Sequence, residues 1–138
     1  MCIQYYMGKD KEDEDAGFIV LSELPGLLSK LYATGNNGSC FVLSVPGTEG
    51  RDGHTASLQF SMEGSEIGLD WVLLAERNIH DKGEFLKIVS EYDLNMEEET
   101  SNGIDYIRVE KSRELLVSIA SQILKEMYGI TDSTEMPL

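Results

Sequence analysis

The clearest pattern in the middle of the chain is an alternation of hydrophobic and polar residues over positions 56–62. The hydrophobic members share one side of an extended segment, and they are Ala56, Leu58, Phe60 and Met62. This period of two predicts a strand with one face on the core and the other in water. Residues 67–76 resume the alternation after a polar segment of hairpin length. Residues 39–45 are apolar on both faces, so we predict an antiparallel meander of three strands.

Two segments that flank this meander carry apolar residues at helical spacing. Leucines recur every three or four positions over residues 24–31, and Pro25 suits the first turn of such a helix. Residues 34–38 are rich in glycine and asparagine and should end it. After the third strand, Asp81 and Glu84 have the spacing of a capping box and predict the start of a second helix.

The last helix has the longest apolar stripe in the chain. Ser112 is expected to cap it, and Gly129 to end it in the left-handed conformation. Its stripe comprises Leu115, Leu116, Ile119, Ala120, Ile123, Leu124 and Met127. We expect the stripe to lie across the core face of the sheet, over Leu58, Phe60, Leu69, Trp71 and Leu73. Truncation of Ile119 or Ile123 to alanine should then destabilise the fold, whereas Gln122→Ala on the polar face should change little.

These elements predict one α+β domain. Residues 97–103 are polar and are interpreted as a loop, and residues 104–109 as a short strand. The fold class is therefore α+β, with an antiparallel sheet of about four to five strands packed against a long C-terminal helix and two shorter helices. The domain is predicted to span 16–130. It is preceded at 1–15 by a short β-prone start and an acidic linker, and followed at 131–138 by a flexible tail.

The charge of the chain narrows the classes of partner. Of 138 residues, 11 are Lys or Arg and 25 are Asp or Glu, which gives a formal net charge of −14. Such a charge repels phosphate backbones and anionic lipids, so neither a nucleic acid nor a membrane is expected as a partner. We interpret the acidic clusters at 9–15 and 97–99 as serving solubility, with recognition as the alternative.

The termini and the two cysteines bear on the compartment. The N-terminus lacks the basic start and apolar run of a signal peptide, and the longest strictly apolar run is residues 71–75. We therefore expect a cytoplasmic, bacterial-type protein. Cys2 and Cys40 do not form a CxxC motif, and Cys40 lies in a hydrophobic stretch where a small buried thiol is the usual interpretation.

No motif in the sequence specifies a reaction. The glycine-rich segment 47–53 lacks the Gly-Lys-Ser/Thr ending of a phosphate loop and the ligand spacing of a calcium loop. His54 and His80 each have an aspartate nearby, but neither belongs to a zinc or hydrolase motif, and both are interpreted as exposed turn histidines. We therefore assign no catalytic, cofactor-binding or metal-binding residue and predict that the protein is not an enzyme.

One face of the predicted sheet is more apolar than a face in water requires. Val42, Val72 and Leu74 share the side that also carries Asp70, opposite Trp71. We interpret Asp70 as a strand-edge charge in water; the alternative is a buried carboxylate paired with Arg77 or Arg108. The candidate partner-binding face consists of Val42, Asp70, Val72 and Leu74.

Taken together, these features resemble the class I chaperones of type III secretion systems and related peptide-binding chaperone-like proteins. The resemblance is carried by the strand at 67–75, the helix that opens at Asp81, and the segment from Tyr106 through Ser112 to Gly129. That family is small, acidic and cytoplasmic. It has two strands between its last two helices, where the pattern here shows one.

The resemblance implies a non-enzymatic module that binds a protein or peptide, in the form of a homodimer. The alternative function is an immunity-type inhibitor of a basic toxin, because strong negative charge accelerates encounter with a cationic partner. A toxin gene immediately upstream would favour the inhibitor, and secretion or regulatory neighbours would favour the chaperone-like module.

Overall fold

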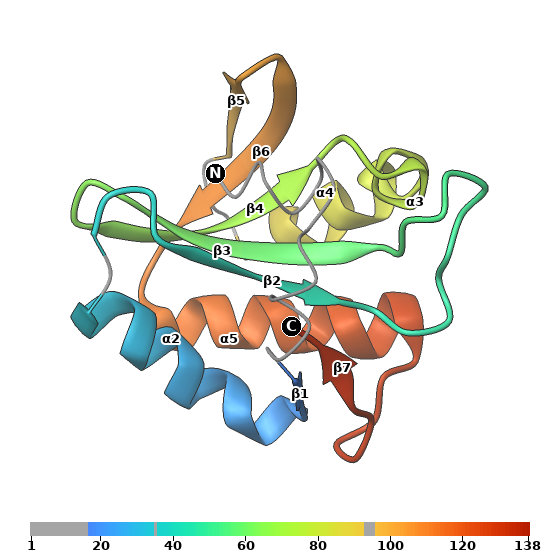
Figure 1. Cartoon of the computed structure of the whole chain (residues 1–138), viewed down its shortest axis with the longest axis horizontal. Helices are drawn as coiled ribbons and strands as arrows, with labels where there is room; N and C mark the ends of the chain where they lie inside the picture. The colour runs from blue at the N-terminus through green and yellow to red at the C-terminus, as the bar shows by residue number, and fades with distance from the viewer. Residues whose placement is uncertain (1–16, 35, 93–95) are drawn as a thin grey trace.

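A twisted antiparallel sheet organises the chain in this computed structural model, which describes residues 17–34, 36–92 and 96–138 (Figure 1). Its strand order is β2-β3-β4-β6-β5. The strands are β2 (Cys40–Ser44), β3 (Ser57–Glu63), β4 (Glu66–Val72), β5 (Glu97–Ser101) and β6 (Ile104–Glu110). The α+β class, the meander β2-β3-β4 and its antiparallel pairing are as the sequence predicts.

Strand β5 corrects the interpretation of residues 97–103 as a loop. It pairs with β6 from Glu97 opposite Arg108 to Ser101 opposite Ile104, so that only Asn102 and Gly103 remain in the turn. Both turn residues have positive φ (53° and 80°), as a tight hairpin turn requires. Figure 1 shows the hairpin of β5 and β6 rising from the sheet on the side away from α2 and α5.

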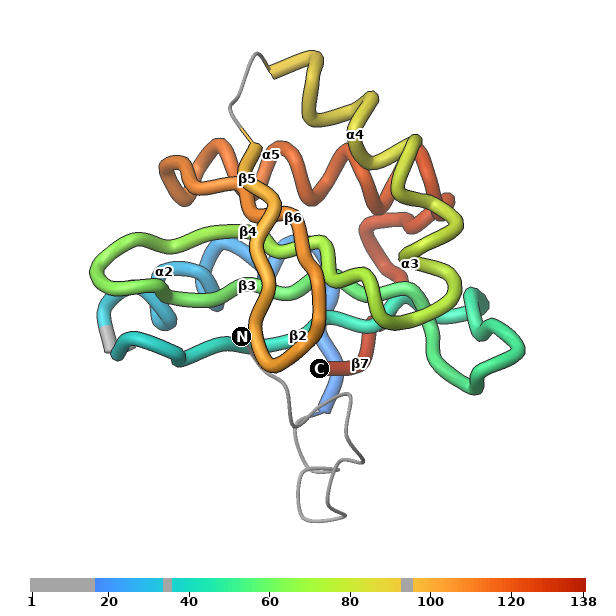
Figure 2. Tube along the Cα trace, turned by 90° about the horizontal axis from the view of Figure 1, so that it is seen from above, coloured from blue at the N-terminus to red at the C-terminus, as the bar shows by residue number. Residues whose placement is uncertain are grey.

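The helices build the core on one face of the sheet. Helix α2 (Leu24–Thr34) follows the short 3₁₀ turn η2 (Leu21–Glu23). Helix α5 (Arg113–Gln122) continues into a π-helical turn, η3 (Ile123–Met127). Both lie below the sheet in Figure 1, and α3 (Glu76–His80) and α4 (Lys82–Ser90) pack near one end of α5 (Figure 2). The predicted C-terminal helix is thus confirmed as an α-helix that ends in a π-turn.

The side chains expected under the last helix are in the core. Leu58, Phe60, Leu69 and Trp71 are fully buried with Ile119 and Ile123, and Leu73 packs against them at the margin. Trp71 stacks on Phe85 of α4 with ring centroids 4.6 Å apart, which fixes α4 to the same core. Ser112 caps α5 by accepting a hydrogen bond from the Leu115 amide, and Gly129 ends the helix at φ 65°, both as predicted.

Three boundaries differ from the sequence predictions. Strand β4 ends at Val72 instead of near residue 76, because α3 begins at Glu76. Asp81 precedes α4, but it makes no capping hydrogen bond. Segment 131–138, expected as a flexible tail, includes β7 (Met136–Pro137), which pairs with β1 (Phe18–Ile19) and buries Met136. The predicted β-prone start and acidic linker at 1–15 lie outside the described residues.

None of the helices in the described part of the chain is both long and apolar enough to cross a membrane.

Candidate functional site

A row of cross-strand neighbours runs over the face of the sheet opposite α2 and α5, which we call the second face. The row has one residue from each of the five neighbouring strands of the sheet, each directly opposite the next: Val42, Gln59, Asp70, Arg108 and Glu97. Four members of the row are buried, and Asp70 and Gln59 are fully so. The alternation of β3 and β4 dictates this placement, since their odd and even positions point to opposite faces.

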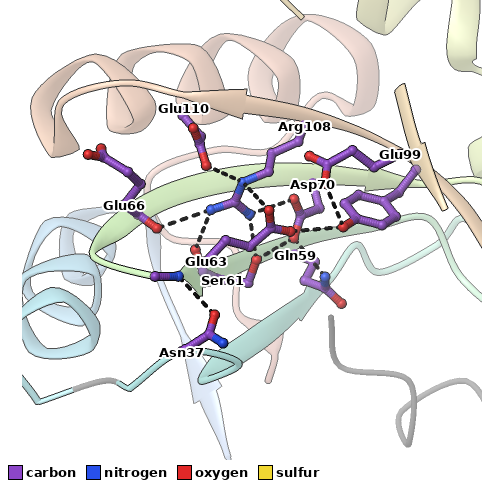
Figure 3. Close-up of polar contacts among 11 residues, drawn as sticks. Asn37, Gln59, Ser61, Glu63, Glu66, Asp70, Glu99, Arg108 and Glu110 are labelled. Atoms are coloured by element: carbon purple, nitrogen blue, oxygen red, sulfur yellow. Dashed lines mark hydrogen bonds and ion pairs between the residues drawn. The ribbon is translucent and has the colours of Figure 1, made fainter. Parts of the chain in front are cut away.

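Asp70 and Arg108 form a buried ion pair at the centre of the second face (Figure 3). Arg108 Nη1 donates to Asp70 Oδ1 at 2.9 Å and to Ser61 Oγ at 2.7 Å. The other Asp70 oxygen accepts from Gln59 Nε2 at 2.8 Å and from Ser61 Oγ at 2.6 Å. Arg108 Nη2 donates to the carbonyl oxygens of Ser61 and Glu66 at 3.2 and 3.1 Å. The pair is therefore held by hydrogen bonds on both charged groups, which offset the cost of its burial.

Gly68 makes room for the guanidinium group. A Cβ atom at this position would lie 2.6 Å from Arg108 Cζ and 2.9 Å from Nη2. Glycine is needed here because a side chain would collide with the guanidinium group. Its backbone conformation does not require glycine, since its φ is not in the left-handed region.

The ion pair is surrounded by further carboxylates toward the surface. Arg108 Nε donates to Glu110 Oε2 at 2.7 Å and lies 3.4 Å from Glu63 Oε1. The Tyr106 hydroxyl donates to Glu63 Oε2 at 2.8 Å and contacts Glu99 Oε1 at 3.3 Å (Figure 3). A single cation thus faces the carboxylates of Asp70, Glu63 and Glu110, with Glu99 joined through Tyr106. The cluster carries surplus negative charge at its exposed rim.

The ionisation of the cluster follows from its burial and its charges. Burial raises the pKa of Asp70, opposed by hydrogen bonds from Ser61 and Gln59 and by the charge of Arg108. Burial alone would lower the pKa of Arg108, but the neighbouring carboxylates, Asp70 first, raise it. Burial and the charge of Glu63 raise the pKa of Glu99. Burial and the hydrogen bond to Glu63 raise the pKa of Tyr106. The charge of Arg108 and the hydrogen bonds to Asp70 thus favour the ionised form of this carboxyl, against the effect of its burial.

A shallow pocket of about 280 Å³ adjoins this rim, where the β5–β6 hairpin meets the start of α4. Its lining residues are Leu73, Lys82, Glu98, Glu99, Thr100, Asp105 and Tyr106. Lys82 lies 3.9 Å from Glu98, and Thr100 donates to Asp105 at 2.6 Å. The pocket is therefore mainly polar, with Leu73 as its one aliphatic lining residue and two glutamates from β5.

The residues predicted as a partner-binding face lie close together, but most are inaccessible. Val42, Asp70 and Val72 are buried, and half-buried Leu74 packs with Val72 in a small apolar cluster. The interpretation of Asp70 as a charge in water is wrong, and Arg108 is its partner, as the alternative proposed. Their role in binding a partner stays a prediction, and the accessible part of this face is its acidic rim.

The two histidines do not join Asp70. His54 is half-buried in the β2–β3 loop. His80 is exposed, and its Nδ1 lies 2.7 Å from Asp81 Oδ1. Among the described residues, no hydrogen bond or ion pair links either histidine to the second-face cluster. In the same part of the chain, no group of three or more ligand-type side chains is arranged to hold a metal ion.

Asp81 fixes the junction of α3 and α4 to the end of the last helix. Its carboxylate accepts from Arg77 Nε and the Tyr128 hydroxyl, each at 2.8 Å, and contacts His80. Burial works to raise the pKa of Asp81, but the bonds from His80, Tyr128 and Arg77 prevail and lower it. These contacts occupy the carboxylate and explain why it does not cap α4.

Cys40 also differs from its prediction. It is half-buried on β2 and is disulfide-bonded, so the expectation of a buried thiol is wrong. Cys2 lies outside the described residues.

Sequence reasoning missed Ser61, Glu63, Tyr106 and the strand β5 as parts of the site. The dipeptide Asn102-Gly103 is the strongest short hairpin signal, and it would have identified β5. Ser61 and Tyr106 carry no comparable signal, because Ser61 bonds to Arg108, 47 residues away, and Tyr106 bonds to Glu63, 43 residues away.

Comparisons with known proteins give no match: no family model fits the chain, and neither the curated proteins nor the solved structures include a significant relative.

Proposed function

We propose that this protein is a non-enzymatic module that binds a basic protein or peptide segment. The observation that carries the proposal is the surplus of carboxylates around Arg108 and along β5. Glu97 and Glu98 are exposed, and Glu63 and Glu99 are half-buried. A cationic partner would neutralise this charge and would be drawn to it over a distance set by the ionic strength.

The buried centre of the cluster suits a structural role, so we assign recognition of the partner to the exposed rim. In the described part of the chain, no buried side-chain nitrogen or oxygen lacks a hydrogen-bond partner. Asp70 and Arg108 are therefore satisfied by each other and by Gln59 and Ser61. The rim carboxylates outnumber the available cations, and they face solvent.

The polar clusters described above do not favour catalysis. Asp81 and His80 form a carboxylate–imidazole pair, but the other contacts of Asp81 are Arg77 and Tyr128, which connect secondary-structure elements. Hydrolysis would need a nucleophile and an oxyanion site beside that pair. A binding function requires neither.

The order of elements is consistent with the chaperone-like resemblance. With β5, two strands separate α4 from α5, which is the arrangement that the resemblance implies. Fold order alone does not determine function, so it supports the proposal without carrying it.

An immunity-type inhibitor of a basic toxin is the second candidate function, because the same acidic rim suits a cationic enzyme surface. The two candidates differ in what is recognised. An inhibitor needs a folded toxin, whereas a chaperone-like module binds an isolated segment.

We propose the cytoplasm as the compartment of this protein. The disulfide at Cys40 favours an oxidising compartment instead, because thiols in the cytoplasm are kept reduced. Alkylation of the protein taken directly from its native cells, with and without prior reduction, distinguishes these conditions. A cytoplasmic, reduced protein is labelled at Cys40 without reductant.

A random-sequence peptide array probed with the labelled full chain tests the proposal. We expect the bound peptides to carry more Lys and Arg than Asp and Glu, and their binding to weaken as salt is raised. Bound peptides without a charge bias, or no bound peptide, would refute it. An immunity-type inhibitor that recognises only a folded toxin surface would bind no peptide on the array.

A further inference from the structure

We infer that the basic segment binds as an added strand on the open edge of β5, extending the sheet beyond its fifth strand. This inference rests on the proposed function and specifies its geometry. Among the described residues, β5 is the last strand on its side of the sheet. An edge strand of this kind presents a row of backbone donors and acceptors to an incoming chain.

The register of β5 identifies the backbone groups that are open. The Leu73 amide donates to the Asp105 carbonyl at 2.9 Å, so this position of β6 bonds toward β4. Hydrogen bonding alternates along an antiparallel strand, and Ile104, Tyr106 and Arg108 therefore bond toward β5. Their partners are Ser101, Glu99 and Glu97. The N–H and C=O groups of Glu98 and Thr100 consequently point away from the sheet.

Charge determines which chain fits this edge. Glu97 and Glu99 lie on the second face, and Glu98 lies on the opposite face with the pocket. Glu98 forms an ion pair with Lys82 at 3.9 Å, whereas Glu97 and Glu99 form no ion pair within 4.0 Å among the described residues. Cross-strand pairs of opposite charge stabilise neighbouring strands. A strand with lysines or arginines two positions apart would place them beside Glu97 and Glu99.

The other alternate positions of the added strand lie beside Glu98 and Thr100, which also line the pocket. Glu98 is already paired with Lys82, and Thr100 is polar and exposed, so small polar side chains suit these positions. The added strand therefore has a basic side and a small polar side.

The same charge disfavours a second copy of this chain as the occupant. Edge-to-edge pairing of two β5 strands would bring six glutamates together, and like charges opposite each other are destabilising. The β5 edge is thus the one suited to a basic partner.

A proline substitution tests the edge directly. Thr100→Pro removes one outward N–H group and leaves the β5–β6 ladder intact, because proline is tolerated where the N–H faces away from the sheet. Thr100→Val is the matched control: it keeps the N–H group and loses the hydroxyl that bonds Asp105. The probe is a peptide of alternating lysine and threonine, about twelve residues long, which spans more than one strand length. Calorimetry measures its affinity for each full-length variant, and circular dichroism confirms that each is folded.

We expect Thr100→Pro to weaken binding at least about tenfold and Thr100→Val to stay within about twofold of the wild type. Equal affinities for the two variants would overturn the inference. The proposed function would still stand in that case if the peptide array selects basic sequences. Hydrogen exchange gives a readout that does not depend on the variants. The peptide should protect the Glu98 and Thr100 amides of the wild type, and unchanged exchange there would also overturn the inference.

Discussion

At the scale of single residues, a substitution of Gly68 tests how closely the side chain of the buried Arg108 is packed. Gly68→Ala would place a Cβ atom within 3.0 Å of three guanidinium atoms. Hydrogen bonds to Asp70, Ser61 and Glu66 hold that group, so it cannot move aside freely. We expect the variant to lose about 1–3 kcal/mol, measured as a lower urea midpoint.

Gly83→Ala in α4 is the matched control for this substitution. A Cβ atom there meets nothing within 4 Å, and alanine favours a helix. This variant should be as stable as the wild type or up to about 1 kcal/mol more stable. If Gly68→Ala unfolds at the wild-type midpoint, Arg108 is not confined as described.

A second residue-scale prediction concerns the charge that Arg108 neutralises. Arg108→Met leaves the Asp70 carboxylate buried without its cation, and at about pH 7 this should cost roughly 3–5 kcal/mol. Burial already raises the pKa of Asp70, and loss of the cation raises it further. A carboxyl whose pKa is raised on folding stabilises the fold below its unfolded pKa, and this stability is lost as the pH rises through the folded pKa.

The deficit of Arg108→Met relative to the wild type should therefore shrink as the pH falls from about 7 toward 4. Urea titrations across this range measure it. Adding Asp70→Asn should recover part of the lost stability and remove most of the pH dependence. A deficit that is constant over the range would contradict the assignment of Asp70 as the orphaned group.

At the scale of elements, the fold depends on α5 and η3 against the sheet. Ile119 and Ile123 are fully buried, so truncating either to alanine should cost about 2–5 kcal/mol in urea unfolding. Gln122 is a poor control, because it donates to Glu91 and accepts from the Tyr92 hydroxyl. Glu126→Ala, at an exposed position of η3, should change the midpoint little. Equal midpoints for Ile119→Ala and Glu126→Ala would show that this helix is not packed on the sheet.

Periodicity predicted the elements whose apolar residues face one core. The strands β2, β3, β4 and β6 and the helices α2, α4 and α5 all have such patterns. It failed for β5, whose residues Glu97 to Ser101 are polar on both faces and are placed by backbone pairing to β6. The alternation also assigned Asp70 to the correct face, but not its environment. Its partner, Arg108, is 38 residues away, and only the sheet register brings the two together.

At the scale of the whole molecule, some carboxylates are buried and hold elements together, and others are exposed at the surface. Asp70 and Asp81 are buried and serve to join strands and helices. Glu97 and Glu98 are exposed on an edge strand, where charge also discourages aggregation. Protection against aggregation and recognition of a basic segment both require charge at this particular edge. Only recognition predicts that the edge binds a basic peptide.

Charge reversal at two pairs of sites separates these roles. Glu97→Lys with Glu98→Lys alters the β5 edge, and Glu49→Lys with Glu135→Lys alters exposed positions elsewhere, so both variants have the same net charge. The measurement is the affinity of the alternating lysine–threonine peptide for each variant and for the wild type. The β5 reversal should reduce affinity at least about tenfold, and the distant reversal should reduce it no more than about twofold. Equal reductions in the two variants would show that net charge alone attracts the peptide and would contradict a binding site at β5.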